Sequence, residues 1–164
     1  MKKTQKKLGN KGFSLVELIV VIAIMAVLVG VLAPTLIKNV EKSRESTDVQ
    51  NLDSLRGAVV TMLSNEKNYD ALVPADNSVT YKADFSVANK CTITAVTGSG
   101  TAPTTFSTNA EKIGEELYET VGNFKAKSKT AKDHDITFTI SSLGKVSASY
   151  KDASPKYVDT FTIE

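Results

Sequence analysis

An uninterrupted apolar run near the N-terminus dominates the pattern of hydrophobic and polar positions. No side chain from Leu18 to Ala33 is polar. Within the longer segment 13–37, the polar side chains are only Ser14, Glu17 and Thr35. A helix of about 20 residues crosses a bilayer core of about 30 Å, so this segment is long enough to span one. In lipid it must be helical, because unpaired backbone groups would be too costly there.

A helical pattern resumes beyond this run and predicts that the helix continues. Apolar residues recur near helical spacing, with charged residues between them, at Val40, Leu52, Leu55, Val59, Met62 and Leu63. Residues 41–48 are polar throughout and are expected to be exposed on both sides of the helix. Pro34 removes one backbone hydrogen bond, which either ends the membrane span or bends a longer helix. We favour one helix from Ser14 to about Lys67, roughly 80 Å long.

The pattern changes to that of β-strands after residue 70. β-Favouring residues with partial alternation occupy five segments, namely 79–87, 90–97, 135–141, 144–150 and 157–163. Residues 98–107 form a loop that contains Gly and Pro, and Thr108 to Glu111 resemble a capping box. That box would open a short helix ending at Gly122. The predicted fold class is α+β, with a long N-terminal helix whose second half packs on a small antiparallel β-sheet.

The distribution of charge separates the N-terminus from the rest of the chain. Residues 1–12 carry five lysines and no acid. The whole chain has 20 basic and 18 acidic side chains, so the remainder is net negative. The basic isoelectric point therefore reflects this cluster, not an affinity of the body for nucleic acid. Because lysines mark the cytoplasmic side of membrane spans, the N-terminus is expected inside and residues 38–164 outside.

Three interpretations of the N-terminal segment compete. A secretory signal peptide has a shorter apolar core, of about 7–15 residues, before a small-x-small cleavage site. The best such site here ends at Ala33 and is followed by Pro34, which signal peptidases generally reject. A plain signal anchor explains the length and the lysines but not Glu17, since a carboxylate costs about 2.5–3.5 kcal/mol at mid-membrane and less near the interface.

The third interpretation rests on a resemblance. Residues 11–17, KGFSLVE, followed at once by the apolar run, resemble the processing site of type IV prepilins and related pseudopilins. The resemblance covers about the first 40 residues and includes the basic leader, Gly12 before Phe13, Glu17 at the fifth mature position and Pro34 near the end of the run. It implies cleavage between Gly12 and Phe13 by a prepilin peptidase on the cytoplasmic side, and methylation of the new amine on Phe13.

The chemistry of these residues agrees with such processing. Gly12 has no side chain, so an extended backbone can enter a protease site there. Cleavage before the apolar run removes the lysines but leaves the helix in the membrane. The new amine on Phe13 stays cationic near neutral pH, because α-amino groups titrate near pH ~8. Glu17 can then pair with the Phe13 amine of a neighbouring copy, which would set axial register.

The resemblance also implies an organisation and a role. The segments would be a leader at 1–12, a transmembrane and assembly helix at 13–37 and an extracellular headgroup at 38–164. The chain would be a structural subunit of a type IV pilus filament used in adhesion or surface motility. It would lie in the cytoplasmic membrane as a single-pass protein before assembly and in an extracellular filament afterwards.

The expected partners and the alternatives follow from the same resemblance. The partners would be the prepilin peptidase and methyltransferase, other copies of the chain in a helical filament, and the assembly platform with its ATPase. One alternative is a pseudopilin of a type II secretion or DNA-uptake system. A more distant alternative is a membrane-anchored surface binding domain.

No catalytic or metal-binding constellation is evident. The single cysteine, Cys91, and the single histidine, His134, can form neither an intramolecular disulfide nor a His/Cys metal site. No phosphate loop or nucleophile–base motif is present, so neither an enzyme nor a cofactor is expected. Cys91 lies in a strand pattern and is predicted to be a buried small hydrophobe. Asp152 and Asp159 could belong to a calcium loop, although calcium takes about six to eight oxygen ligands.

The lysines of the predicted basic loop at 123–134 admit several partners. Lys125, Lys127, Lys129 and Lys132 could bind DNA, an anionic surface or a neighbouring subunit. The preferred interpretation is a solvated loop, because the charge of the chain as a whole is nearly balanced.

Processing is the first testable consequence. Mass spectrometry of the mature protein should show an N-terminus at Phe13 that is about one methyl group heavier than the unmodified chain. Gly12→Val should block cleavage, because a β-branched residue crowds an extended site. A surface-exposed protein that begins at Met1 or at Pro34 would contradict the pilin-like interpretation.

Overall fold

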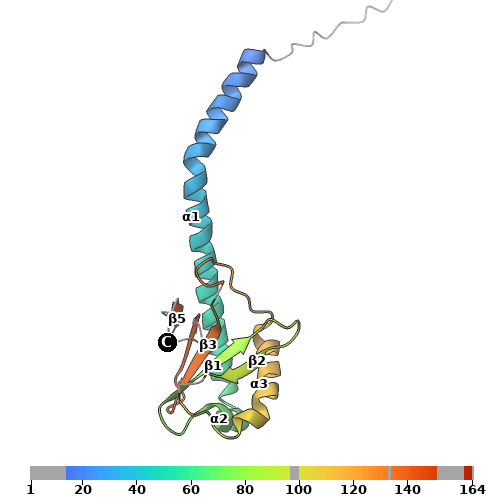
Figure 1. Cartoon of the computed structure of the whole chain (residues 1–164), viewed down its shortest axis with the longest axis vertical. Helices are drawn as coiled ribbons and strands as arrows, with labels where there is room; N and C mark the ends of the chain where they lie inside the picture. Colours follow the sequence, from blue (N-terminus) through green and yellow to red (C-terminus); the bar gives the residue numbers. More distant parts are fainter. Residues whose placement is uncertain (1–13, 97–99, 133, 151–160, 164) are drawn as a thin grey trace, which may run out of the picture. The chain divides into compact units, whose positions relative to one another are not determined.

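The computed structural model describes residues 14–96, 100–132, 134–150 and 161–163 (Figure 1). The chain divides into two compact units, one ending at Val40 and the other beginning at Glu41. Helix α1 (Leu15–Met62) contributes its first half to the first unit and its second half to the other.

The first unit is a helix whose apolar side chains have no covering within it. Every large hydrophobic side chain from Leu15 to Ile37 is between 49% and 72% exposed. The helix is long and apolar enough to cross a membrane. It continues without a break through Pro34, so the expectation that this proline lies inside a longer helix is confirmed.

Helix α1 ends at Met62, and the prediction of a single helix reaching Lys67 was wrong. Ser64 and Asn65 donate backbone hydrogen bonds to carbonyls three residues earlier, which tightens and closes the last turn. The Asn65 side chain then caps a separate helix, α2 (Glu66–Leu72), by accepting a hydrogen bond from the backbone N–H of Lys67 at 3.0 Å. An N-cap residue takes an extended backbone, so it divides two helices that a hydrophobic pattern joins.

A five-stranded antiparallel sheet forms the centre of the second unit. The spatial order is β2-β1-β3-β4-β5. The strands are β1 (Ser78–Asp84), β2 (Thr92–Ala95), β3 (Ile136–Ser141), β4 (Val146–Tyr150) and β5 (Phe161–Ile163). The predicted α+β class is therefore confirmed. Strands β1 and β2 are shorter than the predicted segments 79–87 and 90–97, and part of the predicted strand 157–163 lies outside the described residues.

Helix α3 (Phe106–Val121) begins earlier than the predicted capping box at Thr108. Its N-cap residue, Thr105, makes no side-chain cap. The Thr105 hydroxyl instead donates to the backbone carbonyl of Asp70 at 2.8 Å, which ties the start of α3 to α2. The predicted end is confirmed, since Gly122 is the C-cap with φ 75°, a conformation that favours glycine.

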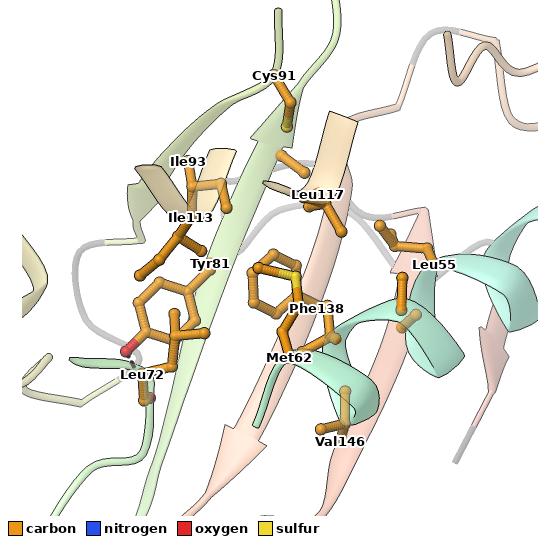
Figure 2. Close-up of a cluster of buried hydrophobic side chains, with 14 of the residues drawn as sticks. Leu55, Met62, Leu72, Tyr81, Cys91, Ile93, Ile113, Leu117, Phe138 and Val146 are labelled. Atoms are coloured by element: carbon orange, nitrogen blue, oxygen red, sulfur yellow. Dashed lines mark hydrogen bonds between the residues drawn. The ribbon is translucent and has the colours of Figure 1, made fainter. Parts of the chain in front are cut away.

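The core lies between the second half of α1, the sheet and α3 (Figure 2). Of the apolar positions predicted for this part of α1, Leu52, Leu55, Val59 and Met62 are buried. Val40 is 43% exposed and does not join the core. The ring of Tyr81 stacks on Phe138, with 5.3 Å between centroids. Its hydroxyl donates to the Leu72 carbonyl at 2.7 Å, which links the sheet to α2.

Cys91 belongs to this core, as predicted. Its side chain is buried, and burial raises the pKa of the thiol to about 12. The sulfur therefore acts as a small hydrophobe and is not an activated nucleophile at neutral pH. Helix α3 packs on strand β2, which follows Cys91 in the chain. A Cβ atom added at Gly114 would lie 2.2 Å from the Cys91 carbonyl oxygen.

This close approach yields a matched pair of variants. Gly114→Ala should lower the free energy of unfolding by about 1–3 kcal/mol, because α3 must move away from the strand. Gly57→Ala, in the exposed face of α1 with no atom within 4 Å of the added Cβ, should raise it by about 0.5–1 kcal/mol. Denaturation of the full chain in detergent measures both. If both variants changed the free energy of unfolding in the same direction and by the same amount, α3 would not approach strand β2 so closely.

Candidate functional site

The predicted processing residues lie at the edge of the described chain. Gly12 and Phe13 fall outside the described residues. Glu17 lies in the first turn of α1 and is exposed. Its Oε2 accepts a hydrogen bond from the backbone N–H of Ser14 at 2.8 Å. A carboxylate in this position satisfies an open amide and interacts favourably with the positive end of the helix dipole.

The exposed face of α1 carries a shallow hollow. Ala23, Ile24, Val27 and Leu28 line a depression of about 300 Å³. A small residue beside larger ones leaves a groove between side-chain ridges, and such grooves receive the ridges of another helix. This face of α1 has one such groove between its side chains.

A second candidate site lies on the polar part of α1. Glu41, Glu45 and Asp48, here called the acidic triad, are spaced so that they share one face of the helix. Asp48 is fully buried. The backbone N–H of Lys127 lies 2.9 and 3.1 Å from the two Asp48 carboxylate oxygens, and that of Ser128 lies 2.7 Å from Oδ2.

The other two members of the triad bind the following residues of the same loop. Glu41 accepts a hydrogen bond from the backbone N–H of Lys129. Oε1 of Glu45 accepts one from the Thr130 hydroxyl at 3.0 Å. Three carboxylates thus bind four consecutive residues of a segment about eighty positions later in the chain. The prediction that residues 41–48 are exposed on both sides was wrong for Asp48, because the loop covers it.

The loop is anchored at its ends as well as in its middle. Phe124 is buried and stacks on Phe85, with 5.5 Å between ring centroids. Ser128 and Ala131 are also buried, and the Ser128 hydroxyl accepts a hydrogen bond from the backbone N–H of Ala131 at 3.2 Å. Residues 125–132, here called the lysine loop, therefore have a fixed backbone and not a freely solvated one.

The lysine side chains of this loop all face solvent. Lys125, Lys127, Lys129 and Lys132 are exposed, whereas Ser128 between them is buried. Their exposure agrees with the predicted solvated face. The sequence did not reveal the anchoring, since hydropathy alone assigns an aspartate between Thr47 and Val49 to the surface.

No site for a metal or for catalysis is found in the described part of the chain. Asp152 and Asp159, the possible calcium ligands, lie outside it. Among the described residues, no group of three or more His, Cys, Asp or Glu side chains could hold a metal ion. A depression of about 850 Å³ is lined by residues of α2 and of the loop before α3, including Tyr69, Asp70 and Thr105. Those three side chains do not form a nucleophile–base pair.

The comparisons with known proteins bear on the N-terminus alone. Residues 7–33 match the family described as the prokaryotic N-terminal methylation motif, the signature of type IV pilins and pseudopilins. This is a structural motif and not that of an enzyme family. No curated protein and no solved structure matches the chain.

The buried carboxylate of the triad can be tested by a matched substitution. Asp48→Asn puts an amide group against two backbone donors, so the free energy of unfolding should fall by about 2–3 kcal/mol. Hydrogen exchange at the amides of Lys127 and Ser128 should accelerate. Asp53→Asn changes an exposed carboxylate on the same helix, one paired with Arg56 at 2.9 Å, and should change stability by less than about 1 kcal/mol. Comparable losses in the two variants would contradict the role given to Asp48.

Proposed function

We propose that this chain, a protein of the type IV pilin or pseudopilin kind by its N-terminal methylation motif, is a structural subunit of a type IV pilus filament. The observation that carries the proposal is the exposed apolar half of α1 directly after that motif. Its large side chains from Leu15 to Ile37 are about half to three-quarters exposed and lack a core of their own.

Such a surface requires another apolar environment. Exposed apolar area costs about 25 cal/mol per Å², so a row of aliphatic side chains this long is not stable in water. Lipid covers it in the membrane, and helices of other copies would cover it in a filament. The hollow at Ala23, Ile24, Val27 and Leu28 is suited to the second environment.

The transfer from lipid to filament needs more than hydrophobicity. Lipid tails are as apolar as leucine, so moving the helix into a bundle gains no hydrophobic free energy. Packing and polar pairing must supply the preference. Glu17 is the acid in the first turn of α1, and its exposed carboxylate accepts a hydrogen bond from the backbone N–H of Ser14. It can therefore receive the Phe13 amine of an adjoining copy, and this pair would fix the stagger between copies.

The proposed subunit would pass through processing, a membrane-anchored stage and assembly. Residues 1–12 would hold the N-terminus in the cytoplasm until the prepilin peptidase cuts between Gly12 and Phe13 and the new amine is methylated. Residues 13–37, with Pro34 inside the helix, would remain in the membrane, and residues 38–164 would form the outer headgroup. The assembly platform and its ATPase would then move the subunit into an extracellular filament. A head-to-tail contact that does not close is the geometry that produces such an open helical assembly.

Glu17 provides the discriminating test. Glu17→Ala removes a costly charge from an apolar helix, so membrane levels should be unchanged or slightly higher. In a filament the Phe13 amine of the adjoining copy would lose its partner, and breaking a buried pair from one side costs about 3–5 kcal/mol. We expect normal membrane levels and few or no filaments sheared from cells that lack the native copy.

Two controls make the result specific. Asp53→Ala removes an exposed carboxylate from the second half of the same helix and should leave the filament yield near wild type. A wild-type yield from Glu17→Ala would show that the carboxylate does not set register and would favour a plain membrane anchor. If the wild-type protein yields no sheared filaments but its loss abolishes protein secretion or DNA uptake, the pseudopilin alternative replaces the pilus subunit.

A further inference from the structure

We propose that the lysine loop binds the phosphates of anionic lipids at the outer surface of the membrane while the subunit is membrane-anchored. The inference rests on the membrane stage of the proposed function and adds a lipid contact to it. Its basis is the attachment of a loop with four lysines to the helix immediately beyond the apolar run.

The attachment limits how far the loop can lie from the membrane. The apolar run ends at Ile37, and Glu41, which binds the backbone N–H of Lys129, follows four residues later. Four residues extend no further than about 14 Å even when fully stretched. This limit comes from the chain alone and holds at any angle between the two units. Because α1 is a continuous helix through these residues, the actual rise from Ile37 to Glu41 is about 6 Å, so the loop is attached close to the end of the apolar run.

The lysine side chains of the loop remain exposed to a partner. Residues 125–132 contain four lysines and no acid. The nearby carboxylates of the acidic triad accept hydrogen bonds from backbone amides and from Thr130. Within the described part of the chain, the four ammonium groups of the loop form no ion pair. The triad thus orders the loop while its lysine side chains stay exposed.

Position favours lipid phosphate over other anionic partners. The attraction of a charged membrane falls off within a Debye length, about 8 Å at physiological salt, so only basic groups close to the surface contribute. Lys67 lies in α2, beyond the end of α1 at Met62, and α1 rises about 30 Å from Glu41 to that end. The same molecule therefore contains an exposed lysine far from the loop along the helix, which serves as an internal reference.

The experiment uses the wild-type full chain inserted in vesicles. One set contains phosphatidylcholine alone, and the other contains one third phosphatidylglycerol. Brief acetylation with a water-soluble reagent, followed by peptide mass spectrometry, gives the reaction rate of each lysine. At low salt, Lys127 and Lys129 should react about threefold or more slowly in the anionic vesicles, and high salt should abolish the difference. The rate at Lys67 should be the same in both sets.

Each other outcome has a defined meaning. Equal rates at Lys127 and Lys129 in the two sets would overturn the lipid contact. Slower acetylation of Lys127 and Lys129 that depends on protein density but not on lipid charge would also overturn it and would indicate a contact between copies. Flotation of the vesicles tests the membrane stage separately. A chain that does not float would defeat the proposed function, whereas a floating chain with unprotected lysines would defeat only this inference.

Matched charge variants give a second measurement. Lys127→Gln with Lys129→Gln should reduce the phosphatidylglycerol enrichment among lipids that stay with the protein after mild detergent extraction. Lys67→Gln with Lys112→Gln removes the same charge from exposed sites in α2 and α3 and should leave that enrichment unchanged. If both double variants lost the same amount of phosphatidylglycerol enrichment, net charge would explain the effect, and the assignment to the loop would be overturned.

Discussion

The apolar surface on the first half of α1 is the constraint on which the rest of the protein depends. Among the described residues of its unit, its side chains are exposed, so the helix needs either lipid or other helices around it. Because these two environments are equally apolar, the choice between them must come from packing and charge. In the proposed filament, the hollow at Ala23 would supply the packing and the carboxylate of Glu17 the charge.

In the second half of the same helix, the apolar side chains are buried by the chain itself. Leu52, Leu55 and Val59 are buried against the sheet, and the chain covers them with its own strands and with α3. No intramolecular disulfide is possible with a single cysteine, so packing and hydrogen bonds must hold the headgroup. The contacts of Tyr81 with Phe138 and with the Leu72 carbonyl join the sheet to α2 in this way.

The acidic triad joins the second half of the helix to the lysine loop. It lies at the start of the second unit, directly after the apolar run, and binds a loop distant in sequence. A buried carboxylate is costly unless donors surround it, and the loop amides provide those donors. The same bonds fix the backbone of a loop whose lysine side chains are exposed. One set of contacts therefore stabilises the second unit and, in the proposed lipid contact, would determine which charges face the membrane.

The sequence by itself determined the features that depend on local or cumulative side-chain chemistry. The membrane-length apolar run, the α+β class, the stop at Gly122 and the burial of Cys91 could all be predicted from it. The motif around Gly12, Phe13 and Glu17 was also evident, and the match over residues 7–33 agrees with it. The tertiary structure alone decided where α1 ends, where α3 begins and that Asp48 is buried. The reason is physical: hydropathy scores each side chain against water, whereas Asp48 is stabilised by amides seventy-nine and eighty positions away, which only the folded chain brings to it.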